Sequence, residues 1–361
     1  MPTRRSPKAS MSDVAKVAGV SVTTVSHVIN RTRVVSEATE RAVMAAVAEC
    51  GYVPEHTARS LRHVGARTIG VAMSAISNVY FGEVVQAIES EAAAHGFTML
   101  LADTHDRPTD EIRVVANFLE RGVEAVILAP ASDGREAIAQ AARAGVPLTL
   151  VDRLVPQAAV DQVGTENVGP MRELVSHLAD AGHRRIGMVS GLPGVVTTEE
   201  RVTGYRQALR SKGIRASSDL IRSGSSDVAG GRAALLELLD LPKPPTAVVV
   251  ANNLMTIGAL QGARERGLRI PEDLALVSFD DFPWADVFHP RLTAMAQPTE
   301  LLGREAVRMV LARLADPQLP PRRVVMPPTL KHRDSCGCAY GSLDPTAIPA
   351  DRASAPASSS T

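Results

Sequence analysis

The stretch from residue 13 to residue 30 constrains the fold of this chain more than any other part of its sequence. Small apolar residues recur there at the three- and four-residue spacing of a helix, first before Gly19 and again after Ser21. Gly19 can end the first helix, and the hydroxyl of Ser21 can cap the second. The pattern therefore predicts two short helices joined by a tight turn, with a third helix over residues 36–49.

The two faces of the second predicted helix differ in character. Val25, Val28 and Ile29 are spaced to face the core. The other face carries small polar side chains and a histidine, which is typical of a helix that reads base edges in the DNA major groove. The DNA-binding residues expected here are Ser21 as the cap, Val22, Thr23 and His27 at base edges, and Thr24, Ser26 and Asn30 at phosphates.

Any small helical hairpin could show this first pattern, but the residues that follow make it specific. Residues 23–30 read TTVSHVIN, and they are followed by Tyr52-Val53-Pro54 and by TARSLR at residues 57–62. With these motifs the chain resembles the LacI/GalR family of transcriptional regulators over residues 10–335, and its DNA-reading helix is most similar to that of the family's purine repressors. The resemblance implies that residues 58–62 form a hinge helix, with Leu61 wedged into the minor groove and Ala58 and Arg62 beside it.

Charge is divided unevenly along the chain. Residues 1–62 hold nine Lys and Arg against five Asp and Glu, whereas the whole chain is neutral, and a basic head suits phosphate binding. No apolar run is long enough to span a bilayer, and residues 1–10 lack an apolar signal segment, so we expect a cytoplasmic, nucleoid-associated protein. The three cysteines, including Cys336 and Cys338, predict neither a disulfide framework nor a metal site.

Beyond residue 67, short apolar runs alternate with helical stretches. Four runs lie at 68–73, 98–101, 125–128 and 147–151, and three more lie at 185–189, 247–250 and 274–279. Apolar strands joined by crossover helices predict parallel, doubly wound sheets that are covered on both faces. The expected fold is an all-α helix-turn-helix head followed by a two-lobed α/β core like that of the periplasmic binding proteins, which the family resemblance also implies.

The expected domains follow from these patterns and from the resemblance. They are a DNA-binding head at 10–56, a hinge helix and linker at 57–67, an effector-binding and dimerisation core at 68–333, and a disordered Pro/Ala/Ser tail at 334–361. The resemblance implies that the chain crosses between the lobes near 164, 293 and 322. The N-lobe is then about 68–164 and 294–321, and the C-lobe about 165–293 and 322–333.

Polar residues follow four of the predicted strands at their carboxyl ends, where open α/β sheets bind ligands. Acceptors, an arginine and an aromatic wall suit a polyhydroxylated molecule, because each hydroxyl needs a partner once water is removed. Each strand-end Asp or Asn could instead cap a helix. The resemblance implies an effector cleft lined by Ser74, Tyr80, Phe81, Asp152, Thr197, Arg201, Asn252 and Asp280.

Several positions depart from the family pattern. Val195 stands where purine repressors have a ligand-binding arginine, and Ser226 where they have a stacking phenylalanine. Asn253 replaces a usual acid and Leu254 a common amide, while His27 replaces a more common arginine in the DNA-reading helix. We therefore expect a sugar or sugar derivative as effector, with a purine- or nucleoside-responsive regulator of the same family as the alternative.

Other classes of protein fit the sequence less well. The chain has no phosphate-binding loop, nucleophile elbow or zinc-protease motif, so we expect no catalytic residues and no cofactor, although Asp152 and Asp280 could in principle form an acid–base pair. A solute-binding receptor would share the two-lobed core but needs a secretion signal and no DNA reader. The sequence predicts a homodimeric repressor that binds a pseudo-palindromic, double-stranded operator and responds to a small molecule, with no membrane partner.

Overall fold

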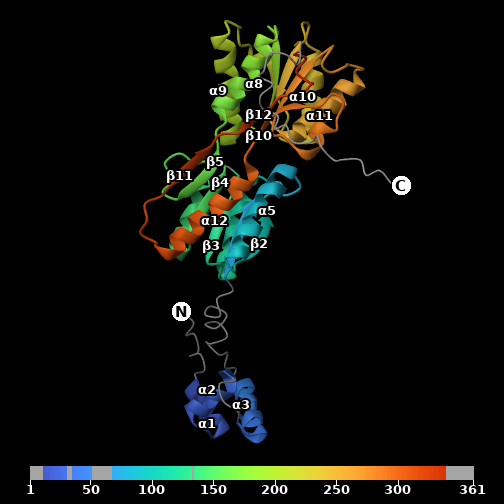
Figure 1. The fold of residues 1–361 in the computed structure, drawn as a ribbon. Helices are drawn as coiled ribbons and strands as arrows, with labels where there is room; N and C mark the ends of the chain where they lie inside the picture. Colours follow the sequence, from blue (N-terminus) through green and yellow to red (C-terminus); the bar gives the residue numbers. More distant parts are fainter. Residues whose placement is uncertain (1–10, 31–34, 51–66, 132–133, 339–361) are drawn as a thin grey trace, which may run out of the picture.

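The computed structural model describes residues 11–30, 35–50, 67–131 and 134–338 (Figure 1). The head consists of α1 (Met11–Ala18), α2 (Val22–Asn30) and α3 (Glu37–Cys50). Its small core contains Val14, Val25 and Val43, all fully buried. This arrangement confirms the predicted helix-turn-helix and its predicted third helix.

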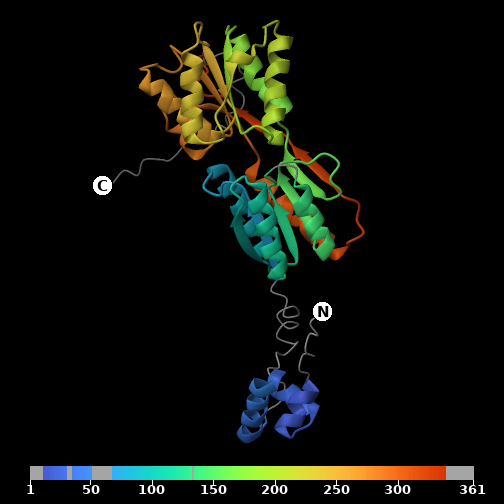
Figure 2. The same ribbon diagram turned by 180° about the vertical axis from the view of Figure 1, so that it is seen from behind.

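The N-lobe is built on a six-stranded parallel sheet in the order β11-β5-β4-β3-β1-β2. Helices α5 (Val79–Ala94) and α12 (Thr299–Ala315) pack together on one face, and α6 (Pro108–Glu120) and α7 (Arg135–Ala144) cover the other (Figures 1 and 2). The strands are β1 (Thr68–Met73), β2 (Thr98–Asp103), β3 (Ala125–Leu128), β4 (Leu148–Asp152), β5 (Asp161–Thr165) and β11 (Arg323–Met326).

The C-lobe repeats this plan with the sheet order β12-β10-β9-β8-β6-β7, in which only β12 is antiparallel to its neighbour. Helices α8 (Val168–Asp180) and α9 (Val196–Ser211) form one layer, and α10 (Val228–Leu239) and α11 (Asn253–Glu265) the other (Figure 1). The strands are β6 (Ile186–Ser190), β7 (Ile221–Ser223), β8 (Ala247–Val250), β9 (Ala275–Phe279), β10 (Thr293–Ala296) and β12 (Thr329–Lys331). Two 3₁₀ turns, η1 (Ser218–Leu220) and η2 (Pro283–Asp286), complete it.

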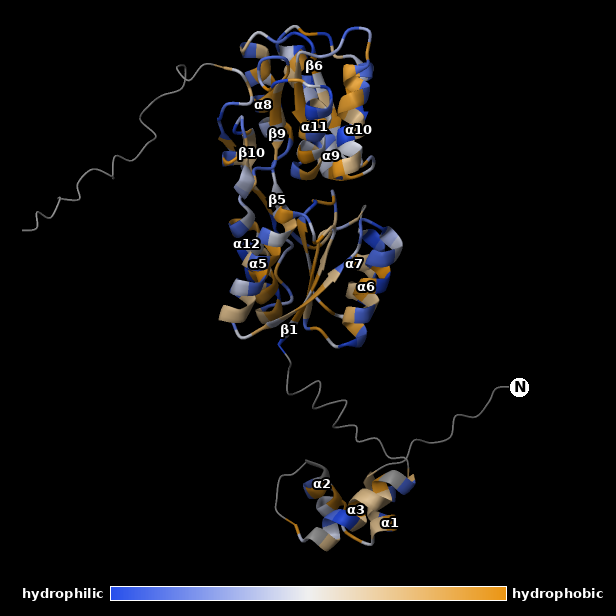
Figure 3. Cartoon of the chain, turned by 90° about the vertical axis from the view of Figure 1, so that its right-hand side faces the viewer, coloured by the Kyte–Doolittle hydropathy of each residue, from blue (hydrophilic) through white to orange (hydrophobic). Residues whose placement is uncertain are grey.

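Apolar strands between two layers of amphipathic helices account for both lobes. Strands such as β3, β8 and β9 are buried at every position, and β9 is coloured as hydrophobic in Figure 3, whereas the helices carry both hydrophilic and hydrophobic residues. A strand that is covered on both faces has no solvent side, so it reads as a continuous apolar run. The predicted two-lobed, doubly wound core is therefore confirmed. Within the described ranges, no helix is long and apolar enough to cross a membrane.

The chain passes between the sheets three times, and two of these crossings lie later than the bounds expected near 293 and 322. Strand β10 (Thr293–Ala296) still belongs to the C-lobe sheet, and β11 (Arg323–Met326) belongs to the N-lobe sheet. The second crossing therefore follows Ala296 and the third follows Met326. Each of these short strands continues its sheet beyond the bound that the family resemblance implies, and this displaces the boundary.

The expectation of a disordered tail from residue 334 is wrong for residues 334–338. Ser335 is fully buried, and its hydroxyl donates to the carbonyl of Leu276 at 2.6 Å and accepts from the amide of Thr293 at 2.9 Å. Cys336 is also fully buried. These bonds attach the segment to the C-lobe sheet, which a prediction from tail composition could not detect. The rest of the predicted tail and the predicted hinge helix, including Ala58, Leu61 and Arg62, lie outside the described residues.

Candidate functional site

The DNA-reading helix α2 begins where the sequence predicts. Gly19 has a φ of +66°, and the amide of Val20 closes the turn by donating to the carbonyl of Ala15 at 3.1 Å. The hydroxyl of Ser21 then accepts from the amide of Thr24 at 3.1 Å, and the two hydroxyls lie 2.9 Å apart. This bonding makes Ser21 the N-cap of α2 and engages Thr24 at the same end of the helix.

The faces of α2 also match the prediction where the structure describes its side chains. Val25 is fully buried and Val28 nearly so, whereas Val22 is 46% exposed. Thr23 is exposed, and Ser26 and His27 are half-buried. The helix ends at Asn30. The first residues expected to read bases, Val22 and Thr23, therefore lie at the exposed N-terminal end of α2, as a recognition helix requires.

A small cavity, partly open to solvent, lies between the two lobes. Its lining combines strand ends and helix starts from both lobes, which is where open α/β sheets bind ligands. We call this space the interlobe cavity. Its lining residues are Ala75, Asn78, Tyr80, Phe81, Asp106, Asp152, Arg153, Gly191, Val195, Thr197, Thr198, Arg201, Ser226, Ala251, Asn252, Met255, Asp280 and Gln297.

The cavity brings together seven of the eight predicted effector residues, and Ser74 is the exception. Ser74 is fully buried behind the lining, where its hydroxyl accepts from Arg153 Nη1 at 3.2 Å. Thr197 and Arg201 reach the cavity from α9, and Tyr80 and Phe81 reach it from the first turn of α5. The two aromatic rings meet edge to face with centroids 5.1 Å apart.

A chain of hydrogen bonds crosses the cavity from one lobe to the other. The hydroxyl of Tyr80 donates to Asp152 Oδ1 at 2.6 Å and lies 3.3 Å from Gln297 Oε1. Gln297 Nε2 in turn donates to Asp280 Oδ1 at 2.5 Å. Asp152 ends an N-lobe strand and Asp280 follows a C-lobe strand, so this chain links the two strand ends.

Arg201 is fixed from several sides. Its Nε donates to Asn167 Oδ1 at 2.8 Å, its Nη1 donates to the carbonyl of Ala251 at 2.6 Å, and its guanidinium lies 3.8 Å from the centroid of the Phe279 ring. Its Nη2 is 4.0 Å from Asp280 Oδ1. The arginine is thus positioned beside the acid without forming a close pair with it.

Arg153 is held on the N-lobe side. It forms an ion pair with Asp106 and donates to the carbonyl of Pro130 at 2.9 Å. Its Nε is buried and has no hydrogen-bond partner among the described residues, and it lies 3.7 Å from Asp152 Oδ2. An unsatisfied buried donor costs about 1–3 kcal/mol, so a ligand oxygen that reached it would recover part of that cost.

Burial sets the protonation behaviour of the two groups at the centre of the cavity. Burial raises the pKa of Asp280, and Arg201 and the Gln297 hydrogen bond oppose that rise only in part. Burial raises the pKa of Tyr80 well above its usual value, and the neighbouring charge of Asp152 raises it further. Tyr80 therefore stays a hydroxyl donor, while Asp280 is a carboxyl group that gains from additional donors.

Asp152 and Asp280 share an unusual backbone conformation. Their φ angles are +68° and +70°, in the left-handed region that side-chain-bearing residues rarely adopt. Such strain is found where the surrounding structure fixes a side chain for a function. Asn252 behaves differently, because its side-chain oxygen caps α11 by accepting from the amide of Met255 at 2.8 Å. The alternative reading of strand-end residues as helix caps is thus correct for Asn252, although this residue also lines the cavity.

Six polar residues of the lining were not among the predicted effector residues: Asn78, Asp106, Arg153, Thr198, Ser226 and Gln297. Arg153 directly follows the predicted Asp152 at the end of a predicted strand, so its position was a usable signal. Gln297 follows β10, and it was missed because that short strand was not recognised. A larger groove lies along α11, and none of the predicted effector residues lines it.

Two family models match the sequence. Residues 10–55 match the model described as bacterial regulatory proteins, lacI family, and residues 175–336 match a periplasmic binding protein-like domain. The chain is 33% identical over 332 residues to the HTH-type transcriptional repressor PurR of Vibrio atlanticus, covering 91% of this chain and 98% of that protein. It is 33% identical over 303 residues to the HTH-type transcriptional repressor CytR of Escherichia coli K12, covering 84% and 89%.

Solved structures share both the head and the core. A complex of the transcriptional regulator CelR with cellobiose matches with a TM-score of 0.70 and 32% identity, covering 91% of this chain and 99% of that one. The Lac repressor dimer bound to its operator and the anti-inducer ONPF matches with a TM-score of 0.70 and 29% identity, with the same coverage.

Proposed function

Because this chain belongs to the LacI family of bacterial regulatory proteins, we propose that it controls transcription by coupling a polyhydroxylated effector in the interlobe cavity to an operator bound by α2. The chain is a ligand-responsive transcriptional repressor and not an enzyme, like the relatives that it matches over most of its length. Our proposals concern the chemical class of the effector, the residues that bind it, and the assembly that binds DNA.

The observation that carries the effector proposal is the row of polar groups across the cavity. Asp152 and Asp280 supply acceptors, and Arg153 and Arg201 supply donors on the same two sides. A sugar presents hydroxyls that both donate and accept, so one molecule can satisfy all four groups. We therefore propose a sugar or sugar derivative, and the similarity to a regulator solved with cellobiose supports this class.

A base-containing effector is less well supported by the lining. Val195 and Ser226 both border the cavity, and neither offers a flat surface or a charge to a base. The aromatic groups of the lining, Tyr80 and Phe81, meet edge to face, and the hydroxyl of Tyr80 is engaged with Asp152. The purine or nucleoside alternative therefore depends on this single aromatic wall.

The same hydrogen bonds suggest how binding is transmitted. In this structure, Asp152 of one lobe and Asp280 of the other are connected through Tyr80 and Gln297. An effector that takes over these bonds changes the relative free energies of different lobe arrangements. Because the N-lobe follows the head in the chain, we propose that this change alters the spacing of the two heads in a homodimer and hence the operator affinity.

For the DNA side, we propose that Val22, Thr23 and His27 read base edges in each half of a pseudo-palindromic operator. Ser21, Thr24, Ser26 and Asn30 contact the backbone or hold the helix end. Ala58, Leu61 and Arg62, outside the described residues, are proposed to reach the minor groove. A selection from random duplexes tests this proposal. A near-palindrome of roughly 14–18 base pairs is expected, and an asymmetric single half-site as the best binder would contradict it.

The effector proposal is tested by calorimetry with a panel of sugars, nucleosides and purines. Wild-type protein is expected to bind a sugar, and Asp280→Ala and Arg201→Ala are each expected to lose about 1–3 kcal/mol of affinity for it. Both variants should still bind operator, because the head is separate from the cavity. Unchanged effector affinity in both folded variants would show that the two residues are structural, and binding of purines alone would select the alternative.

A further inference from the structure

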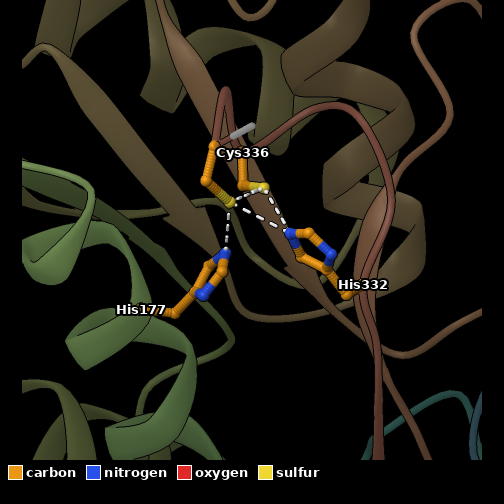
Figure 4. A group of neighbouring side chains, drawn as sticks. His177, His332 and Cys336 are labelled. Atoms are coloured by element: carbon orange, nitrogen blue, oxygen red, sulfur yellow. Dashed lines mark hydrogen bonds between the residues drawn. The ribbon is translucent and has the colours of Figure 1, made fainter. Parts of the chain in front are cut away.

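The C-lobe contains a second cluster of chemically reactive side chains that the repressor function does not use. His177 in the last turn of α8 faces His332, Cys336 and Cys338, which follow β12 at the end of the described chain (Figure 4). The four donor atoms lie within 4.8 Å of one another. Cys336 is fully buried, and the other three residues are half-buried.

The donor atoms all converge on one point. Cys338 Sγ lies 3.0 Å from the Nε2 atoms of both His177 and His332, and Cys336 Sγ lies 3.3 Å from His332 Nε2. The two sulfur atoms are 2.8 Å apart. Each histidine therefore presents the same ring nitrogen to the sulfurs, as two ligands of a common ion would.

We propose that His177, His332, Cys336 and Cys338 bind a zinc ion that fastens the end of the C-lobe to α8. Two thiolates and two imidazoles form one of the recurring donor sets of structural zinc sites. A tetrahedral ion with sulfur at about 2.3 Å and nitrogen at about 2.0–2.1 Å separates its ligands by roughly 3.3–3.8 Å. The donor separations, from 2.8 Å up to at most 4.8 Å, bracket these values, so small side-chain movements suffice.

Charge favours the same ion. Two thiolates balance the charge of Zn²⁺, and neutral imidazoles add none, so the occupied site carries no net charge in its buried position. A tetrahedral set of two sulfurs and two nitrogens selects zinc over calcium or magnesium, which prefer oxygen ligands.

The backbone that carries three of the ligands is fixed by bonds that do not involve them. The guanidinium of Arg333 pairs with Asp281 at 2.8 Å and with Asp286 at 2.5 Å, and Asp334 pairs with Arg291 at 2.8 Å. Ser335 is bonded to the C-lobe sheet as described above. The residues between the histidine and the first cysteine are thus anchored, so the ligands are held in place before an ion arrives.

The residue between the two cysteines permits their arrangement. Gly337 has a φ of +74°, and a Cβ built there would lie 3.1 Å from the Pro271 side chain. In an extended backbone, residues two apart share a face but lie about 6.6 Å from one another, whereas the left-handed turn at Gly337 lets the Cys336 and Cys338 sulfurs come within 2.8 Å. The motif H-x₃-C-x-C at 332–338 therefore supplies three converging ligands, and α8 supplies the fourth.

Metal analysis of the full-length protein tests this proposal. Protein produced with zinc and a thiol reductant, then dialysed, is expected to retain about one zinc per chain. The double variant Cys336→Ser/Cys338→Ser is expected to retain almost none, whereas Cys50→Ser should retain the wild-type amount, because Cys50 lies in the head. His177→Gln should weaken zinc binding at least about tenfold, and His183→Gln, beyond the end of α8, should not.

Measurements on the wild-type protein test the proposal even if the variants fail to fold. Replacing zinc with Co²⁺ is expected to give the intense visible bands of a tetrahedral site and a sulfur-to-cobalt charge-transfer band. A chelator is expected to lower the melting temperature of the wild type by about 5 °C or more and to leave the double variant unchanged. Zinc retention equal to that of the double variant, a weak octahedral cobalt spectrum, or a Cys336–Cys338 disulfide in the reduced preparation would each overturn the proposal.

Discussion

Asp280 is an acid that the fold buries beside an arginine but not in close contact with it. The nearest guanidinium nitrogen of Arg201 is 4.0 Å away, and Gln297 provides the short hydrogen bond. Burial therefore raises the pKa of this carboxyl group despite its neighbours. A raised pKa in the folded state means that ionisation at neutral pH works against folding. Such a cost is expected at a site that must keep an acceptor ready for a ligand.

Asp280→Asn is accordingly predicted to stabilise the effector-free protein while weakening effector binding. In the unfolded chain this carboxyl group ionises near pH 4. The stability of the wild type therefore falls as the pH rises from about 4 through the raised pKa of the folded state, and above that pKa the stability no longer changes. The amide has no such dependence. The difference in melting temperature should thus grow between pH 4 and neutrality. A variant that is less stable than the wild type at pH 7 would contradict this reading of the site.

His27 is predicted to act on sequence preference more than on overall DNA affinity. If its ring contacts a base edge, His27→Ala should relax selection at one position of each half-site, at a cost of about 1–3 kcal/mol for the preferred operator. Arg62→Ala is the comparison, because loss of a phosphate contact weakens all sequences and flattens the salt dependence. Binding titrations on operator and random duplexes separate the two. Equal weakening of both by His27→Ala would assign His27 to the backbone.

At the scale of elements, the cap of α2 can be separated from its DNA contacts. Ser21 and Ser36 cap α2 and α3 in the same way, with their hydroxyls 3.1 Å and 3.3 Å from the amides of Thr24 and Thr39. Replacing either serine by alanine should cost about 1 kcal/mol of helix stability. Hydrogen exchange in the capped helix should then be faster by roughly fivefold.

Only Ser21→Ala is expected to weaken operator binding beyond this loss of stability, because α2 is the helix proposed to enter the groove. Ser36→Ala is the matched control. If the two variants weaken operator binding equally, then Ser21 acts through helix stability alone and makes no contact of its own.

The elements that could be predicted from sequence are those with strong local signals. Strands β1, β3 and β8 lie within the predicted apolar runs, because strands covered on both faces must be apolar throughout. Strands β11 and β12 alternate between exposed and half-buried positions at the sheet edges, so they carry no continuous run. Their partners lie far away in the sequence, and only the folded chain reveals the pairing.

The same distinction explains the site. Asp152 and Asp280 were predictable because each directly follows a recognisable strand. Gln297 follows a short strand that was not recognised, and Asp106 acts through an ion pair with Arg153 that spans two loops. The cluster of His177 with residues 332–338 depends on the packing of α8 against the last strand of the lobe. Spacing along the chain could indicate three of its members but not the fourth.

At the scale of the whole molecule, one contact joins the lobes directly without belonging to the proposed ligand contacts. Asn253 Nδ2 donates to Asn78 Oδ1 at 2.7 Å, and Asn253 is only 2% exposed. Asn78 Oδ1 also accepts from the amide of Tyr80 at 3.0 Å, so it keeps a partner when Asn253 is lost. Asn253→Ala therefore removes one bond between the lobes at a cost of about 0.5–1.5 kcal/mol to the arrangement seen here.

This variant tests whether the lobe arrangement carries the regulation. By linkage, the factor by which effector changes operator affinity must equal the factor by which operator changes effector affinity. If the Asn78–Asn253 bond exists in only one of the two states, Asn253→Ala should change both factors equally, by about 2- to 10-fold. Titrations of each ligand with and without the other measure them, with the exposed Asn117→Ala on α6 as control. Coupling factors equal to those of the wild type would mean that this contact persists in both states. Regulation must then depend on the Tyr80–Gln297–Asp280 hydrogen bonds or on the three segments that cross between the lobes.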